Sequence, residues 1–159
     1  MVIEVLVGMI ASGKSTWAKK RANEGWIVLN DDAIVNAVHA NQYTLYNKPL
    51  KPLYKSIEDH ILHTAIALGR NVVVDRGVDI SISSRKRWLS IGHSLDCPVW
   101  AIVFEKFPDE VHAERRARSD ARGHSLEYWR GVAKAHGARY EVPTREEGFD
   151  YIVESKWEE

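Results

Sequence analysis

The sequence contains a single cysteine, Cys97, among its 159 residues. One thiol cannot form an internal disulfide, and no CxxC pair or Cys/His cluster has the spacing of a zinc site. The sequence therefore predicts a chain that needs neither disulfides nor structural zinc, and a reducing cytoplasm is the compartment we expect.

An excess of charge of either sign is also absent, because 22 lysine and arginine residues balance 22 aspartate and glutamate residues. General nucleic-acid and membrane-surface binders usually carry a clear basic excess, so the net charge favours neither class and leaves only a local basic patch open. No uninterrupted apolar stretch approaches the roughly 20 residues that a membrane helix requires. The apolar run at the N-terminus is broken by Glu4, so we interpret it as a core strand rather than a signal peptide and expect no membrane partner.

Short β-prone runs alternate with helical segments along most of the chain. Strands are predicted at residues 2–7, 26–29, 71–75 and 98–104, with a weaker candidate at 151–153. Helices are predicted at residues 15–23, 33–40, 53–68, 81–91, 108–123 and 126–136, with a loop at 42–52. This alternation predicts an α/β fold, a doubly wound parallel sheet of about four to five strands with helices on both faces. The length fits one such domain, residues 1–159.

A glycine-rich loop separates the first predicted strand from the first predicted helix. Its sequence, GMIASGKS over residues 8–15, fits G-x-x-x-x-G-K-[ST], and the strand-to-helix context is the one that this motif requires. Glycines let backbone N–H groups turn inward around a phosphate, and the helix start adds the positive end of its dipole. We therefore predict a P-loop NTPase fold that binds ATP or another nucleoside triphosphate, with Lys14 on the β- and γ-phosphates and the Ser15 hydroxyl on Mg²⁺. The predicted nucleotide-binding residues are Gly8, Ala11, Ser12, Gly13, Lys14, Ser15 and Thr16.

Other motifs distinguish between the classes of P-loop protein. The guanine-reading motif N-K-x-D is absent, because Asn47 and Lys48 are followed by Pro49, and no D-x-x-G switch motif follows the third predicted strand. A chain of this length also lacks room for the extra elements of a helicase or an oligomeric motor. A small kinase remains, in which a carboxylate near the end of a neighbouring strand takes the proton of the acceptor hydroxyl.

Three aspartates stand where that carboxylate is needed. Asp31 and Asp32 end the second predicted strand, so one can face the acceptor while the other caps the next helix; the alternative is that both only cap the helix. Asp75 ends the third predicted strand, at the edge where open α/β sheets bind ligands. It can contact Mg²⁺ through water, hold the acceptor, or only terminate the strand with a polar group.

A basic stretch follows the fourth predicted strand, and its arginines are Arg115, Arg116, Arg118 and Arg122. Arg118 and Arg122 are four residues apart, which puts them on one face of the helix predicted for residues 108–123. We interpret this helix as a lid whose two guanidinium groups neutralise charge on the triphosphate during transfer. The alternating charges are equally compatible with a solvated helix surface.

Taken together, these segments resemble the 5′-hydroxyl polynucleotide kinase family, especially its bacteriophage-type kinase module. The resemblance spans nearly the whole chain and is carried, in order, by GMIASGKSTWA, LNDD, GRNVVVDRG with a following SRKRW, RSDARG and VPTREEGFDYIV. It implies ATP-dependent phosphorylation of the 5′-OH ends of DNA or RNA, as in end healing and repair, with Asp31 as the general base. It also implies that Lys14, Ser15, Arg118 and Arg122 act on the ATP phosphates and that Asp75 sits in the acceptor pocket.

The resemblance extends to the C-terminal part of the chain, where Pro143 and residues 147–149 look like the family's closing segment near the nucleotide. The D-x-D-G phosphatase signature that accompanies the kinase in larger end-healing enzymes is missing. We therefore expect a kinase alone, without an obligate protein partner, acting in the host cytoplasm if the chain is phage-encoded.

One position departs from the family. Its members commonly place an arginine three residues after the base, where it holds an acceptor phosphate, but this chain has Ile34 there. Either another residue, such as Arg76 or Arg85, supplies that contact, or the acceptor is different. The predicted acceptor-site residues are accordingly Asp31, Asp32, Asp75, Arg76 and Arg85. A small-molecule kinase acting on a nucleoside, sugar or antibiotic is the alternative function, and a nucleotide-binding regulatory or toxin-type module with little turnover is the third.

Overall fold

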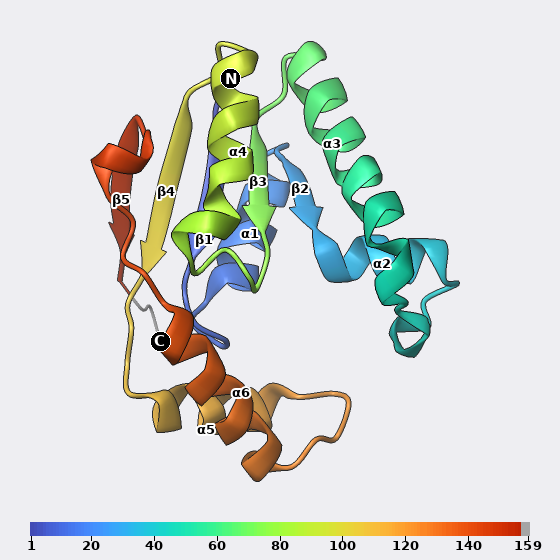
Figure 1. Ribbon diagram of the computed structural model, residues 1–159, viewed down its shortest axis with the longest axis vertical. Coiled ribbons are helices and arrows are strands. Elements are labelled where there is room, and N and C mark those ends of the chain that lie inside the picture. The colour runs from blue at the N-terminus through green and yellow to red at the C-terminus, as the bar shows by residue number, and fades with distance from the viewer. Residues whose placement is uncertain (157–159) are drawn as a thin grey trace.

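The computed structural model describes residues 1–156, which form one parallel β-sheet with helices on both sides (Figure 1). The strands are β1 (Ile3–Val7), β2 (Ile27–Asn30), β3 (Val72–Asp75), β4 (Val99–Phe104) and β5 (Tyr151–Ser155). The α-helices are α1 (Lys14–Asn23), α2 (Asp31–Val38), α3 (Lys51–Ala67), α4 (Ile82–Ser94), α5 (Asp109–Ser119) and α6 (Leu126–Arg139). The strand order is β2-β3-β1-β4-β5, and every neighbouring pair is parallel. The predicted α/β fold with a parallel sheet is confirmed.

The central strands are buried because helices cover both of their faces. Val5 of β1 packs on one face, in a core that also contains Leu62 of α3 and Trp88 of α4. Leu6 of β1 points to the other face, where it packs with Ala18 of α1. The near-continuous apolar runs of β1 and β3 reflect this burial on two sides, as parallel sheets require. The weaker strand candidate is confirmed as β5, which pairs with β4 along its full length.

Helix α2 begins two residues earlier than the sequence suggests, and its cap is Asn30 rather than an aspartate. The Asn30 side chain accepts a hydrogen bond from the backbone N–H of Ala33 at 2.9 Å. The capping role predicted for Asp31 and Asp32 is therefore wrong. Both residues lie in the first turn of the helix, where the helix dipole stabilises negative charge. Both also line the cavity beside the glycine-rich loop.

Residues 42–52, predicted as a loop, contain two short 3₁₀ turns, Tyr43–Leu45 and Lys48–Leu50. Helix α3 begins within the same stretch and holds Pro52 in its first turn, where proline is tolerated because its missing N–H would have no intrahelical partner. A small core centred on Tyr54 packs these turns against α2. This packing fixes the segment that leads from α2 to α3.

Helix α5 ends at Ser119, four residues before its predicted end. Asp120 is extended, and its carboxylate accepts hydrogen bonds from the backbone N–H of Arg122 at 2.9 Å and from the indole N–H of Trp129 at 3.1 Å. These bonds stabilise a turn between α5 and α6 in place of a further helical turn. The helical face predicted to be shared by Arg118 and Arg122 is therefore wrong.

Helices α5 and α6 form a hairpin that lies beyond the carboxyl ends of the strands, whereas α1, α3 and α4 flank the sheet (Figure 1). Ala113, Trp129 and Ala133 form the shared core of the hairpin, and Ile10 of the glycine-rich loop packs against it. The hairpin is thus fixed beside the loop, at the edge of the sheet where open α/β folds bind their ligands.

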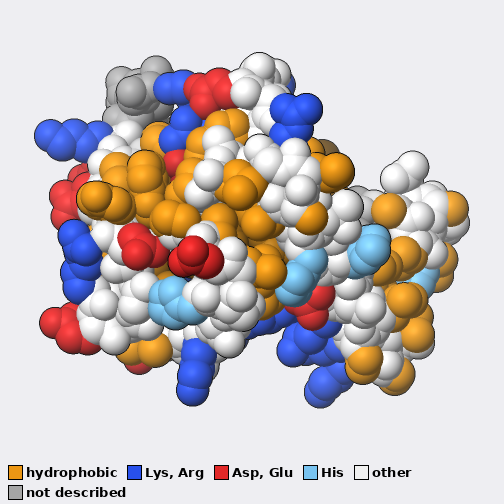
Figure 2. All heavy atoms as spheres, turned by 90° about the horizontal axis from the view of Figure 1, so that it is seen from above, with side chains coloured by type: hydrophobic (Ala, Val, Ile, Leu, Met, Phe, Trp, Pro, Cys, Tyr) orange, Lys and Arg blue, Asp and Glu red, His pale blue; other side chains and the backbone are white. Residues whose placement is uncertain are grey.

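Charged side chains of both signs are mixed at the opposite end of the molecule. Figure 2 shows this end, where hydrophobic side chains gather near the centre and acidic and basic side chains are interspersed around them. This mixture agrees with the net charge of zero and creates no single-sign field on this face. Within residues 1–156, no helix combines the length and the apolar character that crossing a membrane requires.

Candidate active site

The glycine-rich loop follows β1 and turns tightly into α1. Gly13 has a φ of 100°, a left-handed conformation that glycine adopts without strain. A Cβ at Gly8 would lie 2.5 Å from the Ser12 hydroxyl and 2.9 Å from Cβ of Phe104, so this position has no room for a side chain. The Ser12 hydroxyl is buried and has no hydrogen-bond partner within residues 1–156. A phosphate in the loop would supply the missing acceptor, which fits the nucleotide that the motif implies.

Lys14 opens α1 and directs its ammonium group back into the loop. Its Nζ donates hydrogen bonds to the carbonyl oxygens of Gly8 at 2.8 Å and Met9 at 2.7 Å. Burial lowers the pKa of Lys14 to about 8, although the nearby Asp75 opposes the shift. Bound phosphates would raise this pKa again, because neighbouring negative charge favours the ammonium form.

Ser15 and Asp75 place two oxygen donors together beside the loop. Burial raises the pKa of Asp75, whereas Lys14 and hydrogen bonds from Asn30 and Ser15 oppose the shift. Mg²⁺ prefers oxygen ligands, is commonly held by one or two carboxylates together with phosphates, and keeps several waters, so this pair fits it. No group of three or more His, Cys, Asp or Glu side chains arranged to hold a metal occurs in residues 1–156. A metal at this point would therefore depend on the nucleotide for further ligands.

One cavity joins the loop to the ends of β2 and β3 and to α5. Its volume is about 620 Å³, which is in the range of small-ligand sites. Of the residues predicted from the sequence, it brings together Ala11, Ser12, Gly13, Lys14, Ser15, Thr16, Asp31, Asp32, Asp75 and Arg118. The lining residues that sequence reasoning did not assign to the site are Ile10, Asn30, Gly77, Arg115, Arg116 and Ser119. The cavity thus combines cationic groups from the loop and the hairpin with carboxylates at the strand ends.

Three arginines of α5 line this cavity. The guanidinium of Arg115 lies 4.4 Å from the ring centre of Phe107, and that of Arg116 lies 4.8 Å from the ring centre of Trp129. Arg118 is 78 % exposed and pairs with a glutamate of its own helix at 3.6 Å, a contact of the weak surface type. The basic stretch in the sequence pointed to all three, but helical spacing alone could not show which of them face the cavity.

Three arginines predicted at the site, Arg76, Arg85 and Arg122, do not line the cavity. Arg122 follows α5, with its Nη2 3.7 Å from Oδ2 of Asp32 and its guanidinium 4.3 Å from the ring centre of Tyr43. It therefore reaches toward α2 and not toward the phosphate loop. Arg85 of α4 is fully buried, where it pairs with Glu147 at 2.7 Å. The structure does not bring Arg85 to the acceptor side of the cavity.

Residues 147–149, which the family resemblance placed near the nucleotide, support the sheet in this structure. Glu147 is the partner of the buried Arg85, and Phe149 belongs to the main core. Neither this segment nor Pro143 lines the cavity. A role for the segment in closing the nucleotide site stays a prediction.

Asp31 stands at the edge of the cavity with a perturbed carboxyl group. Its side chain is 31 % exposed, and burial raises its pKa to about 6. Asp32 and Glu58 raise the pKa further, whereas Arg76, with Nε 3.6 Å from Oδ2 of Asp31, opposes the rise. A pKa near neutrality suits a general base, because the carboxylate is ionised at pH 7 and still holds a proton well once it has taken one.

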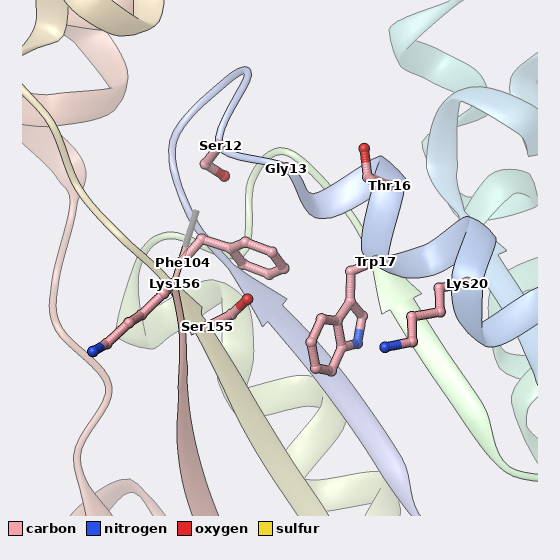
Figure 3. Close-up of a pocket in the computed structure, with 8 residues that line it drawn as sticks. All are labelled: Ser12, Gly13, Thr16, Trp17, Lys20, Phe104, Ser155 and Lys156. Atoms are coloured by element: carbon pink, nitrogen blue, oxygen red, sulfur yellow. The ribbon is translucent and has the colours of Figure 1, made fainter. Parts of the chain in front are cut away.

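A smaller pocket of about 200 Å³ lies beside the loop (Figure 3). Figure 3 shows the rings of Trp17 from α1 and Phe104 from β4 side by side in this pocket, and they meet edge to face with centroids 6.1 Å apart. The Lys20 amine lies 6.0 Å from the centre of the Trp17 ring, whereas Lys156 points away from both rings. The pocket and the cavity share Ser12, Gly13 and Thr16 of the loop and the start of α1, so they are adjacent.

Solved structures share this fold along nearly the whole chain, at sequence identities that show the fold alone. A candidate kinase from Chloroflexus aurantiacus is 13% identical with a TM-score of 0.68, and the match covers 98% of this chain and 84% of that chain. Kti12 from Chaetomium thermophilum, solved with ADP-AlF3, is 16% identical with a TM-score of 0.63 and coverages of 98% and 89%. A gluconokinase from Sinorhizobium meliloti is 18% identical with a TM-score of 0.56 and coverages of 98% and 82%.

A search of curated proteins finds no match to this sequence. The model of a protein family described as an AAA domain matches residues 3–143, which include the phosphate loop, the ends of β2 and β3 and the helical hairpin. The phosphate loop, the parallel sheet and the fold shared with kinases agree with that match. The chain therefore belongs to this AAA domain family and has a P-loop kinase-like fold.

Proposed function

We propose that the protein is an ATP-dependent phosphotransferase that moves the γ-phosphoryl group of ATP to a hydroxyl group of its acceptor. The observation that carries this proposal is that one cavity contains both Lys14 of the phosphate loop and Asp31, a carboxylate whose pKa is raised to about 6. A module that only binds nucleotide needs the loop but has no use for such a carboxylate facing it. The kinase-like fold supports the same reading.

The nucleotide in this proposal extends from the cavity into the smaller pocket. Lys14 and the backbone N–H groups of the loop bind the β- and γ-phosphates, and the arginines of α5 neutralise charge that develops during transfer. Trp17 and Phe104 offer aromatic surface for the base. Ser15 and Asp75 would hold Mg²⁺, which neutralises phosphate charge when it is bound.

Asp31 acts as the general base in the proposed reaction. Its carboxylate accepts the proton of the acceptor hydroxyl while the hydroxyl oxygen forms a bond to the γ-phosphorus. The bond between that phosphorus and the bridging oxygen breaks, and ADP leaves with the bridging oxygen. The protonated Asp31 then returns its proton to water.

The acceptor class that we propose is a small hydroxyl compound without a phosphate beside its reacting hydroxyl. Ile34, at the position where an arginine would hold such a phosphate, is 6% exposed and apolar. Arg76 lies near Asp31 but already faces three carboxylates, and Arg85 is buried. The fold similarity to a gluconokinase supports a small acceptor as well.

Phosphorylation of 5′-OH ends of DNA or RNA is the second candidate function. It is favoured by the ordered set of sequence segments, from GMIASGKSTWA to VPTREEGFDYIV, that resembles polynucleotide kinases. An acceptor phosphate would then need a cation that is exposed enough to exchange its present partner for the phosphate. Arg122, which is 43 % exposed beside Asp32, is such a group at the acceptor end of the molecule.

Transfer of labelled γ-phosphate from ATP in the presence of Mg²⁺ tests both candidates. The acceptors are sugars, nucleosides and aminoglycosides on one side, and 5′-OH DNA and RNA oligonucleotides on the other. We expect Lys14→Ala and Asp31→Asn to abolish the label, with ATP binding retained in Asp31→Asn, whereas Lys19→Ala, at an exposed position of the same helix as Lys14, keeps parent activity.

Label on small compounds that disappears in both variants supports the main proposal. Label only on 5′-OH ends assigns the second candidate. ATP binding without label on any acceptor contradicts a phosphotransferase and favours a nucleotide-binding module.

A further inference from the structure

Arg76, the first residue after β3, lies among three carboxylates. Its Nε is 3.6 Å from Oδ2 of Asp31 and 3.4 Å from Oε1 of Glu58. Its Nη1 is 3.4 Å from Oδ1 of Asp79. These partners belong to α2, to α3 and to the turn between β3 and α4, so one guanidinium joins three segments beside the cavity.

The sheet register brings Arg76 and Asp31 together. Asn30 of β2 and Asp75 of β3 are paired across the two parallel strands, so the next residue of each strand leaves the sheet at the same level. Asp31 and Arg76 are those next residues. Their proximity therefore follows from backbone pairing between segments that are 45 residues apart.

The other two carboxylates of the cluster are buried and contact further side chains that hold them in place. Asp79 is fully buried, and its Oδ2 accepts a hydrogen bond from the Trp88 indole at 3.0 Å. Glu58 is 2% exposed and also pairs with Arg87 of α4. Asp31, at 31 %, is the exposed member of the cluster and the one that lines the cavity.

We propose that Arg76 is a positioning residue for Asp31, which it ties to the buried frame of Glu58 and Asp79 and keeps ionised at neutral pH. The consequence for catalysis rests on the proposed function, in which Asp31 is the base. Arg76 does not itself line the cavity, so it acts through Asp31 and does not contact the acceptor. A nearby cation offsets part of the cost of burying carboxylates of this kind, which favours Arg76 in its place.

The charges around Asp31 give the direction of the effect. The charged and titratable groups around Asp31 come from every segment that packs near it. They are Asp32 of the same helix, Tyr43 of the 3₁₀ turn after α2, Glu58 of α3, Arg76 and Asp79 after β3, and Lys14 of the loop. Burial raises the pKa of Asp31 to about 6, and Arg76 is the strongest influence that lowers it. Removal of Arg76 should therefore raise the pKa of Asp31 and decrease its ionised fraction at pH 7.

Arg76→Gln tests the proposal, and Arg87→Gln is its matched control. Arg87 also pairs with Glu58, and its guanidinium lies 4.5 Å from the ring centre of Trp88, but within residues 1–156 it forms no ion pair with Asp31. Both variants disturb the same buried frame, and only the first removes the cation beside Asp31. Carbon-13 NMR of the aspartate carboxyl groups, assigned for Asp31 with Asp31→Asn, measures the pKa without ATP or acceptor.

We expect the pKa of Asp31 to rise by about one unit or more in Arg76→Gln and to stay at the parent value in Arg87→Gln. The acidic limb of kcat/KM for phosphoryl transfer should move to higher pH by the same amount, with a loss of about tenfold near pH 5 and little loss near pH 9. Arg76→Lys keeps the positive charge, so the acidic limb of its kcat/KM profile should lie close to that of the parent protein. An equal shift in both glutamine variants, or none in Arg76→Gln, would overturn the proposal.

Arg76→Gln leaves the buried Asp79 without its cation, so the double variant Arg76→Gln/Asp79→Asn provides a second test if the single variant does not fold. It removes the unpaired charge together with the arginine. The pKa of Asp31 should still rise, because Arg76 affects it more strongly than Asp79 does; an unchanged pKa would overturn the proposal. The titration needs no turnover, so a parent protein that phosphorylates no acceptor would count against the proposed function and not against this role of Arg76.

Discussion

The guanidinium of Arg122 lies 3.7 Å from the carboxylate of Asp32 and so links the turn after α5 to the first turn of α2. The same guanidinium lies 4.3 Å from the ring centre of Tyr43. Asp32 lines the cavity, as does Ser119, the last residue of α5 before this turn. The contact therefore connects the helical hairpin to the acceptor side of the site.

Arg122→Ala should loosen the hairpin without destabilising the fold. The side chains of the pair are 43 % and 51 % exposed, and exposed pairs contribute about 0–1 kcal/mol. We expect a melting temperature near that of the parent but faster thermolysin cleavage in residues 118–123, measured by mass spectrometry of the fragments. Arg130→Ala breaks an exposed pair with Glu110 in the same hairpin and serves as the control. Equal cleavage in both variants, or cleavage that ATP fails to suppress, would contradict a lid that closes through Arg122.

The affinity for ATP should depend on the protonation of Lys14. Burial lowers the pKa of Lys14 to about 8 in the free protein, and bound phosphates raise it, so binding takes up a proton above about pH 8. We expect the Kd for ATP to increase about tenfold per pH unit above that point. Calorimetry in buffers of different ionisation enthalpy measures the uptake, which Lys14→Met should abolish. A Kd for ATP that stays constant as the pH rises from about 7.5 to 9.5 would contradict a role for the protonation of Lys14.

Two glycine-to-alanine substitutions should change stability in opposite directions. At Gly8 the new Cβ would lie 2.9 Å from Cβ of Phe104, which cannot move apart from its backbone, so we expect a loss of about 1–3 kcal/mol. At Gly131, within α6, a Cβ would meet nothing within 4 Å in the described part of the chain apart from its chain neighbours and the backbone of its own helix, and we expect a gain of about 0.5–1 kcal/mol from helix propensity. Urea unfolding measures both. Gly8→Ala should also lose ATP binding; a variant with parent stability and ATP affinity would show that the loop has room for a side chain.

Asp79→Asn should stabilise the protein more at alkaline than at acidic pH. Burial raises the pKa of Asp79 from 3.8 to about 7, so the folded protein holds a proton that the unfolded chain releases between these values. The aspartate therefore lowers the free energy of unfolding as the pH rises through this window, whereas asparagine does not titrate. We expect the difference between variant and parent to grow by about 1–3 kcal/mol from about pH 4 to pH 8, measured by urea unfolding. A stability difference between variant and parent that is independent of pH would contradict the raised pKa of Asp79.

The sheet was predictable because its strands carry local signals. The run Val72–Asp75 is apolar until a polar residue ends it, and the alternation of such runs with helical segments specifies a parallel α/β fold. The predicted helix boundaries were wrong where a single side-chain hydrogen bond determines where a helix begins or ends. Asn30 caps α2 in place of the aspartates, and Asp120 closes the turn that stops α5, because each side chain reaches a backbone N–H that the sequence does not reveal.

The amino-acid sequence was enough to place a phosphate loop after the first strand, and Asp31 and Asp75 at the carboxyl ends of the second and third strands of a parallel sheet. Loop geometry and strand direction are properties of short segments, so local patterns are enough to establish them. Which arginines reach that edge of the sheet depends on tertiary packing, which buries Arg85, turns Arg122 toward α2 and places Arg76 among carboxylates from three segments. A guanidinium stands at the end of a long side chain and takes the carboxylates that packing brings within reach, so its partners are set by contacts between distant parts of the chain.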